Sequence, residues 1–364
     1  MQPSYSWAWV EAQVAQTTIV WNDGAGRPAP RARRYSSKDQ QNRENAYDEG
    51  FRAVEREVKR APRAKRERLE TQDRIVATFA RFSAVADYLE LYALSRSGLV
   101  VREPDLERRF ENDGVRISSP LDQTIPDATR AASIVFDVLL ERARILGDLY
   151  PFIVSRQEGL SARRPRRIRT YRVLLALTTA HAFHVSKKPD PKKLFEGLVE
   201  RTLRRLGLRT TTTGTSRKRG RGGFQAVLQT ACTDVGLKAS VDGVILSRAA
   251  KDENVDTLAH LDFQDQRRGR WTFIGQATVG ESSNWEAKAK EPSPKVWQDL
   301  IADTHRPSVF LAVPHHVEPL HLESMHQRED AIVLDRLRLA LQDVAPEATE
   351  RELVSAVDAC QVDW

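Results

Sequence analysis

The stretch KDENVDTLAHLDFQDQRRGRWTFIGQATVGESSNWEAKAK, residues Lys251–Lys290, decides the fold that the sequence predicts. Its two apolar runs, 255–261 and 270–278, are typical of β-strands, and a basic, hairpin-like turn joins them. A short polar helix is expected after the second run. Asp256 stands near the start of the first strand and Gln276 near the end of the second. Neighbouring strands of this kind bring the two side chains to one edge of a sheet, which is a common way to build a metal site.

Helices and strands alternate around this stretch. Further strands are expected at Ala239–Leu246 and Ser308–Val313, and helices at Lys193–Leu206, Phe224–Val235, Pro294–Asp303, Asp330–Leu341 and Glu347–Cys360. We therefore expect residues 190–364 to form a mixed α/β domain, with a sheet flanked by helices.

The preceding part of the chain has mainly helical periodicity. Apolar residues recur every three or four positions, and they predict helices at Tyr47–Arg60, Arg66–Ser97, Pro104–Asn112, Asp127–Leu146 and Tyr171–Phe183. Residues 46–185 are therefore expected to form an all-α domain that ends near the proline-containing break at 187–191. Residues 1–45 combine three tryptophans with a stretch rich in Gly, Pro, Arg and Ser, and we interpret them as an aromatic segment and a flexible linker.

Composition narrows the class of protein. Lys and Arg number 57 against 50 Asp and Glu, so the net charge is +7 and the sequence pI is about 9.5, which suits a polyanionic partner. The two cysteines, Cys232 and Cys360, exclude a disulfide framework and a CxxC-type zinc site and fit a reducing cytoplasm. Neither a signal peptide nor an apolar run of the ~20 residues that a membrane span needs is found, so a cytoplasmic protein without a membrane partner is expected.

The polar groups at the predicted sheet edge suit a hard metal ion. Mg²⁺ prefers oxygen ligands, and Asp256 offers a carboxylate while Gln276 offers an amide oxygen without negative charge. A lysine would normally complete such a site, because a cation stabilises the charge that builds on a phosphate. Thr278 stands two residues beyond Gln276 instead, and the next lysine is Lys288, on the following helix.

Two other sets of residues could bind a metal ion. Asp242 stays open as an alternative first ligand, although its Asp-Gly step is equally typical of a turn. The histidines His315, His316, His321 and His326 lie close together in the sequence. Without HExxH spacing or a cysteine partner, they favour a structural role over zinc binding.

The residues of the sheet edge and its surroundings resemble the PD-(D/E)XK, or restriction-endonuclease-like, nuclease superfamily. More narrowly, they are similar to a branch found among bacterial anti-phage and restriction-associated genes, in which glutamine replaces the usual glutamate. The resemblance covers residues 192–341, and the matching segments are Lys251–Asp256, Gly275–Gly280, Asn284–Lys288, Val309–His315 and Leu334–Arg338. It implies a restriction-endonuclease-like α/β core and hydrolysis of DNA with Mg²⁺ or Mn²⁺.

The resemblance also implies roles for individual residues. Asp256 and Gln276 would hold the metal ion. Lys288, with Lys290 as the second choice, would supply the lysine that position 278 lacks. Glu196 matches a glutamate that this superfamily often carries on the helix before the sheet.

Three basic clusters are expected to contact the DNA backbone. They are the loop residues Arg217, Lys218, Arg219 and Arg221, the linker residues Arg163, Arg164, Arg166 and Arg167, and the turn residues Arg267, Arg268 and Arg270. For the linker, a solvated loop remains an open interpretation. No base-reading helix is recognised, so sequence preference is expected to be weak or supplied by a partner.

Two functions follow from this layout. The first is a metal-dependent DNA endonuclease, the nuclease component of a bacterial anti-phage or restriction system. The second is a degenerate nuclease fold that binds DNA or a partner subunit, because Gln276 and Thr278 replace the usual acid and lysine. No GxxxxGK[ST] loop is present, so a helicase or ATPase would be another subunit of the system. A homo-oligomer, and a helical domain that carries the function itself, remain open.

Overall fold

The computed structural model describes residues 4–5, 82–95, 100–112, 128–165, 167–183, 189–213, 223–240, 255–265, 267, 269–280, 282–302 and 304–362. The chain divides into two compact units. Unit 1 comprises Met1–Arg166 and Asp358–Trp364, and unit 2 comprises Arg167–Val357. This boundary differs from the expected one near 187–191, because the helix at Thr170–Phe183 belongs to unit 2.

Unit 1 is built mainly from helices. They are a helix over 82–95, α4 at Glu103–Asn112, α5 at Ala128–Leu146 and the short η1 at Gly147–Leu149. The predicted helices at Pro104–Asn112 and Asp127–Leu146 are confirmed, and 82–95 falls within the helix predicted at Arg66–Ser97. The predicted helix Tyr47–Arg60 and the tryptophans of residues 1–45 lie outside the described residues.

A β-hairpin also belongs to unit 1, for which an all-α structure was predicted. β2 (Phe152–Ser155) pairs antiparallel with β3 (Gly159–Ala162), and β1 (Ser4–Tyr5) pairs parallel with β9 (Gln361–Val362). Gly159 has a φ of 87°, and a Cβ there would lie 2.4 Å from the Val101 carbonyl oxygen, so this position requires glycine. Strands of four residues are too short to show a clear periodicity of two, and the sequence pattern therefore missed the hairpin.

A buried ionic network joins the helix over 82–95 to α5. The completely buried guanidinium of Arg142 donates to a carboxylate oxygen of Glu90 at 2.9 Å and lies 2.8 Å from a carboxylate oxygen of Asp87. Glu90, which is also completely buried, accepts the Tyr150 hydroxyl at 2.5 Å. Because buried charges are tolerated only when they are paired and hydrogen-bonded, this network restricts how the two helices can pack.

Unit 2 contains a five-stranded mixed sheet with the order β4-β5-β6-β7-β8. The strands are β4 at Leu208–Thr212, β5 at Thr257–Leu261, β6 at Thr272–Ala277, β7 at Ser308–Ala312 and β8 at Ala331–Leu334. β4, β5 and β6 are antiparallel to one another in turn, whereas β6, β7 and β8 run parallel. Thr212 and Gly275 both lie opposite Thr257, so the start of β5 and the ends of β4 and β6 share one edge of the sheet.

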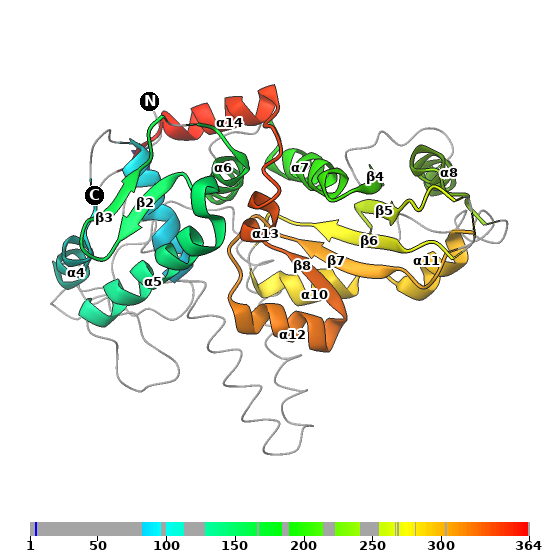
Figure 1. The fold of residues 1–364 in the computed structure, drawn as a ribbon, viewed down its shortest axis with the longest axis horizontal. Coiled ribbons are helices and arrows are strands. Elements are labelled where there is room, and N and C mark those ends of the chain that lie inside the picture. The colour runs from blue at the N-terminus through cyan, green and yellow to red at the C-terminus, as the bar shows by residue number, and fades with distance from the viewer. Residues whose placement is uncertain are drawn as a thin grey trace, which may run out of the picture. The chain divides into compact units, whose positions relative to one another are not determined.

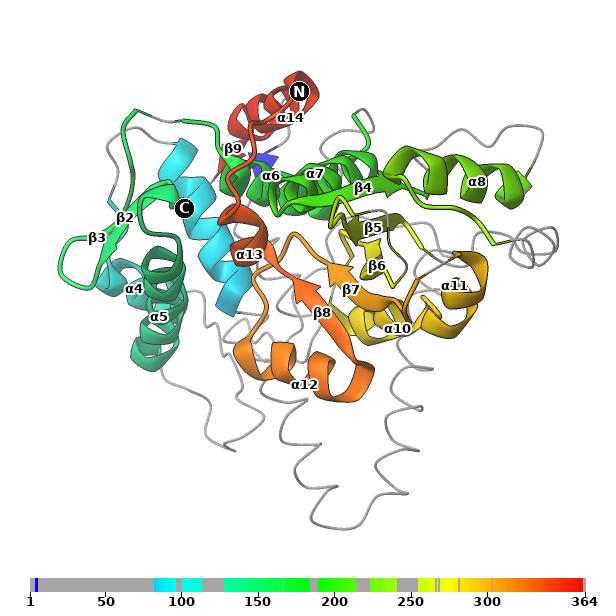
Figure 2. The same ribbon diagram turned by 45° about the vertical axis from the view of Figure 1, so that its right-hand side comes forward.

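Helices cover both faces of this sheet. The helices of unit 2 are α6 at Thr170–Phe183, α7 at Pro191–Arg205, α8 at Gly223–Val235, α10 at Trp285–Lys290 after the short η2 at Ser282–Asn284, α11 at Pro294–Leu300, α12 at Pro319–Glu329, α13 at Arg336–Ala340 and α14 at Ala348–Asp358. Figures 1 and 2 show α7 along one side of the sheet and α10 and α12 along the other. α7 packs on β4, β5 and β6, and α10 packs on β6 and β7. The mixed α/β sheet flanked by helices is therefore confirmed.

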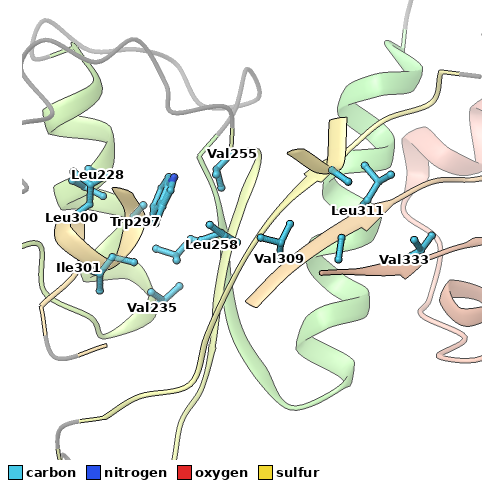
Figure 3. Packing of buried hydrophobic residues seen from close by; sticks show 14 of the residues in the cluster. Leu228, Val235, Val255, Leu258, Trp297, Leu300, Ile301, Val309, Leu311 and Val333 are labelled. Carbon is cyan, nitrogen blue, oxygen red and sulfur yellow. The ribbon is translucent and has the colours of Figure 1, made fainter. Parts of the chain in front are cut away.

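The main hydrophobic core of unit 2 lies between the sheet and the helices α8, α10, α11 and α12. Figure 3 shows Leu228 and Val235 of α8 gathered with Trp297 of α11 and Leu258 of β5. The completely buried indole of Trp297 meets the ring of Phe224 edge-on, with the ring centroids 6.2 Å apart. Removal of these side chains from water is the main favourable term for folding of this unit.

The helix predicted at Asp330–Leu341 is wrong over its first half. Ala331–Leu334 forms β8, and only Arg336–Ala340 is helical, as α13. Residues of β8 alternate between more and less buried positions, and the strand pairs with β7. A short apolar run of this kind has no periodicity that separates strand from helix, so the neighbouring strand decided its structure.

Other predicted elements of unit 2 are confirmed to within a few residues at each end. The exception is the strand at Ala239–Leu246, of which Ala239 forms an isolated bridge with Ile301 while 241–246 lie outside the described residues. In the part of the chain that the structure describes, no helix combines the length and the apolar character needed to cross a membrane.

Arg336 explains why α6 belongs to unit 2. Its completely buried guanidinium donates to the Thr178 hydroxyl of α6 at 3.1 Å and to the Pro314 carbonyl oxygen at 2.8 Å. The same group lies 5.6 Å from the ring centroid of Tyr171, also on α6. These contacts hold α6 to the end of the sheet through residues that are far apart in the sequence.

Candidate active site

Asp256 and Gln276 lie side by side at the sheet edge where β5 begins and β6 ends. The backbone N–H of Asp256 donates to the carbonyl oxygen of Gly275 at 2.9 Å. The Asp256 carboxylate accepts the backbone N–H of Ala277 at 3.1 Å. These two hydrogen bonds hold Asp256 against the residues on either side of Gln276. Antiparallel pairing thus brings together the two residues that the sequence analysis matched to metal ligands.

Gly275 allows the backbone next to Gln276 to pack closely on β7. A Cβ at this position would lie 2.5 to 2.6 Å from three ring carbons of Phe310, which is its partner across the sheet. Real Cβ atoms do not approach other atoms so closely, so the absence of a side chain is a packing requirement. Gly275 therefore leaves room for the Phe310 ring over the backbone that precedes Gln276.

Glu291 connects Gln276 to Lys288, and sequence reasoning did not single it out. The Gln276 amide nitrogen donates to Glu291 Oε2 at 2.6 Å. The Lys288 ammonium donates to both carboxylate oxygens of Glu291, at 2.8 and 2.9 Å. The only sequence signal was an acid three residues after Lys288, a spacing that puts both on one side of a helix. The site thus contains a second carboxylate beside Gln276.

The surroundings of Asp256 disfavour the ionised form of its carboxyl group. Burial raises the pKa of Asp256 above its ordinary value, and the charge of Glu291 raises it further. The hydrogen bond from Ala277 and the positive charges of Lys192 and Lys288 oppose this shift without cancelling it. Since the folded chain disfavours ionised Asp256, a bound cation at this edge would relieve that cost.

We expect Asp256→Asn to raise the melting temperature of the metal-free protein at neutral pH. A carboxyl whose folded pKa is raised contributes stability at low pH that is lost as the pH rises through that pKa, so ionised Asp256 destabilises the fold at pH 7. The gain should shrink as the pH falls towards the ordinary aspartate pKa of about 3.9, where wild type and variant are both neutral. Thermal unfolding in EDTA between pH 4 and pH 8 measures it, on a scale of roughly 2–4 °C per kcal/mol.

Asp262→Asn is the matched control for this measurement. Asp262 follows the far end of β5, and its pKa is lowered by the hydrogen bond from the Gln264 backbone and by the charge of Arg209. Its replacement should therefore leave the melting temperature unchanged or lower it at pH 7. Equal responses of the Asp256 and Asp262 variants would contradict the electrostatic description of the site.

Thr278 has a structural role in the turn after β6. Its backbone N–H donates to Ala312 of β7 at 3.0 Å, and its hydroxyl accepts the backbone N–H of Gly280 at 3.2 Å. Both interactions shape the turn that leads to α10. Position 278, for which the resemblance implied a lysine, thus has a threonine that holds the backbone.

Trp285 anchors α10, the helix that carries Lys288. Its indole N–H donates to the Gly280 carbonyl oxygen at 2.9 Å, and its ring contacts the rings of His315 and His321, each with centroids 5.6 Å away. Burial, with a smaller contribution from the charge of Arg328, lowers the pKa of His321 to about 4, so its ring is neutral at physiological pH. These two histidines pack around the tryptophan and fix the first turn of the site helix.

Glu196 is completely buried on α7, a helix that packs on β4, β5 and β6. Its location on the helix before the sheet is the one that the sequence analysis assigned to it. Lys192 stands one turn earlier on the same helix, and its charge acts on Asp256. Lys192 was not among the predicted site residues.

Of the predicted phosphate contacts, the described residues Arg267 and Arg270 do not lie at this edge. The β5–β6 register places Arg267 and Arg270 at the opposite end of the two strands, where Arg270 donates to the Gly236 carbonyl oxygen at 2.7 Å. Arg163 and Arg164 belong to unit 1 and Arg167 begins unit 2. Other predicted residues lie outside the described part of the chain: Arg166, Arg217, Lys218, Arg219, Arg221, Asp242, Arg268 and 251–254.

The donor set at the sheet edge fits a hard divalent cation. Asp256 and Glu291 provide two carboxylates, and Gln276, whose amide nitrogen faces Glu291, provides an amide oxygen. Among the described residues, no group of three or more His, Cys, Asp or Glu side chains is arranged to hold a metal ion. A cation here would thus use two carboxylates, the amide oxygen and water, a composition that Mg²⁺ accepts because it retains several water ligands.

Comparisons with protein-family models, with curated proteins and with solved structures found no match to this chain.

Proposed function

We propose that unit 2 is a metal-dependent DNA endonuclease with a restriction-endonuclease-like core, acting as the nuclease component of a bacterial anti-phage or restriction system. The observation that carries this proposal is the cluster at the sheet edge, in which Gln276 and Lys288 donate to Glu291 while the Asp256 carboxylate accepts the backbone N–H of Ala277, next to Gln276. Carboxylate and amide oxygens can hold the metal ion that assists phosphodiester hydrolysis, and an ammonium group can stabilise the charge on a phosphate.

The arrangement of the sheet supports the same proposal. A mixed sheet flanked by helices carries an acid before one strand and a glutamine at the end of its antiparallel neighbour, as the resemblance to the PD-(D/E)XK superfamily leads one to expect. The helix before the sheet, α7, carries the buried Glu196. The parallel strand β7 follows after α10 and α11. The helix α10, which carries Lys288, packs against both β6 and β7.

Each residue of the site would have a separate role in hydrolysis. Asp256, Glu291 and the amide oxygen of Gln276 would hold Mg²⁺ or Mn²⁺, which when bound supplies positive charge against the charge that builds on the scissile phosphate. Lys288 neutralises Glu291 and keeps its carboxylate oriented towards Gln276. The hydrogen bond from Ala277 keeps Asp256 pointing at the same edge.

Plasmid cleavage by the full chain tests this function. We expect nicking or linearisation with Mg²⁺ or Mn²⁺, none with EDTA, and a loss of at least about 10²-fold in Asp256→Asn, the scale of several kcal/mol of lost transition-state stabilisation. Mg²⁺ should also raise the melting temperature of the wild type but not of Asp256→Asn, because only a competent site gains binding energy.

The control for this assay is Asp262→Asn, which removes an acid that follows the far end of the same strand. This variant should cleave DNA like the wild type. Cleavage that persists unchanged in Asp256→Asn excludes the assignment of the site. Cleavage that persists in EDTA excludes a requirement for a divalent cation.

A second candidate function is binding without catalysis, either of DNA or of a partner subunit such as a helicase or ATPase. The observation in its favour is that Thr278 and Lys288 are both engaged in contacts within the chain. This alternative predicts no cleavage with any divalent cation, together with DNA binding that weakens steeply with salt. Cleavage by the purified chain alone dismisses it.

A further inference from the structure

The first turn of α7 lies at the same sheet edge as Asp256. α7 ends at Arg205, and after the turn at 206–207 the chain runs back along it as β4. The 15 residues of α7 span roughly 22 Å, whereas the five residues of β4 span roughly 17 Å. The residue after β4, Thr213, donates its backbone N–H to the Asp256 carbonyl oxygen at 2.8 Å. The helix therefore starts beside the strand ends that carry the candidate site.

Lys192 is an exposed residue of this first turn, in line with a buried residue of the next turn. It precedes the completely buried Glu196 by four residues, a spacing that puts both side chains on one helix face. Lys193 is also exposed, but its side chain leaves the helix about 100° further round. The two adjacent lysines therefore point in different directions from the helix, although they have the same charge and both are exposed.

Lys288 and Lys192, the two lysines whose charges act on Asp256, differ in the contacts of their ammonium groups. Lys288 is bound through its ammonium group to both oxygens of Glu291. Within the described residues, the Lys192 ammonium makes no hydrogen bond or ion pair, and it is exposed to solvent. Among the charges that oppose the effect of burial on the pKa of Asp256, Lys192 acts more strongly than Lys288. Lys192 is thus a cation held close to the site carboxylate and available to an anion.

We infer that Lys192 is the residue that contacts the substrate phosphate at this edge, in place of the lysine that position 278 lacks. An ammonium group binds phosphate as a compact point charge on a flexible stem, so it can reach from a helix to a phosphate held beside Asp256. This inference rests on the proposed function for the identity of the anion, a phosphate of the DNA backbone. It assigns to α7 the contact that the sequence analysis gave to α10.

The test compares Lys192→Gln with Lys193→Gln in the full chain, using a short DNA duplex with Ca²⁺ in place of Mg²⁺ so that the DNA stays intact. One phosphate contact contributes about 0.9 to the slope of log K against log salt on duplex DNA. We expect Lys192→Gln to lose about that much slope while Lys193→Gln keeps it, and Lys192→Arg to restore it. In single-turnover cleavage with Mg²⁺, Lys192→Gln should be about 10²-fold slower than Lys193→Gln.

The binding and cleavage readouts separate this inference from the proposed function. If the two glutamine variants change slope and rate equally, the inference is overturned, even where the wild type cleaves DNA. If the wild type does not cleave but only Lys192→Gln loses slope, the phosphate contact stands and the nuclease function fails. Equal melting temperatures of the two variants verify that neither result comes from a folding defect.

Discussion

Replacing Arg142 with alanine is expected to lower the free energy of unfolding of unit 1 by about 3–5 kcal/mol, one of the two largest effects of any single substitution proposed for this chain. Arg142 is completely buried and faces the carboxylates of Glu90 and Asp87, so its removal leaves uncompensated negative charge inside the unit. Denaturant unfolding followed by circular dichroism measures the change, and an unchanged m value would show that only stability was altered.

Arg156→Ala is the matched control, because Arg156 also pairs with two acids of unit 1, Glu103 and Asp137, but its side chain is 44% exposed. Exposed ion pairs contribute about 1 kcal/mol or less, so this variant should remain close to the wild type. The double variant Arg142→Met with Glu90→Gln should lose less stability than Arg142→Ala alone, since it removes charge from both sides. If Arg142→Ala costs no more than Arg156→Ala, the buried network does not hold the two helices together.

Trp297→Ala is expected to destabilise unit 2 by about 3–5 kcal/mol, through lost burial and the cavity left behind. Its indole is completely buried between α8 and the sheet, with Phe224 edge-on to it. Trp271→Ala provides the comparison, because Trp271 is 51% exposed and its loss should cost about 1 kcal/mol or less. Thermal unfolding of both variants measures the difference.

The Trp297 variant also tests how the site is supported. α11 begins at Pro294, close after Glu291, so a loosened α11 should weaken the contact between Glu291 and Gln276 as well. We therefore expect Trp297→Ala to lose cleavage activity at temperatures where it is still folded, whereas Trp271→Ala keeps it. Equal stability of the two variants would contradict the description of the core.

The secondary structure of unit 2 was largely predictable because its long helices and central strands carry clear hydrophobic periods. The strand predicted over 255–261 is observed at Thr257–Leu261, with the same end. The missed strands are all short: β2 and β3 in unit 1, and β4 and β8 in unit 2, each with four or five residues. So few residues do not contain enough positions to separate a period of two from one of 3.6, so their pairing partners determined the outcome.

The neighbourhood of Asp256 and Gln276 followed from the sequence because their strands are consecutive and are joined by one connection, residues 262–271. A hairpin of known length brings the start of one strand next to the end of the other, whatever surrounds it. Glu291 did not follow in the same way. Its contact with Gln276 depends on how the chain turns after α10, and a pattern of apolar residues does not record that turn.

The sequence by itself determined the local structure of this protein: where most helices and strands lie, and which two polar residues share the edge of β5 and β6. Only the tertiary structure decided which charges act at that edge. The packing of α10 puts Glu291 and Lys288 beside Gln276, and the packing of α7 puts Lys192 near Asp256. The physical reason is that periodicity specifies which face of a helix is buried, whereas the position of the helix along the sheet depends on the fit of side chains from distant parts of the chain.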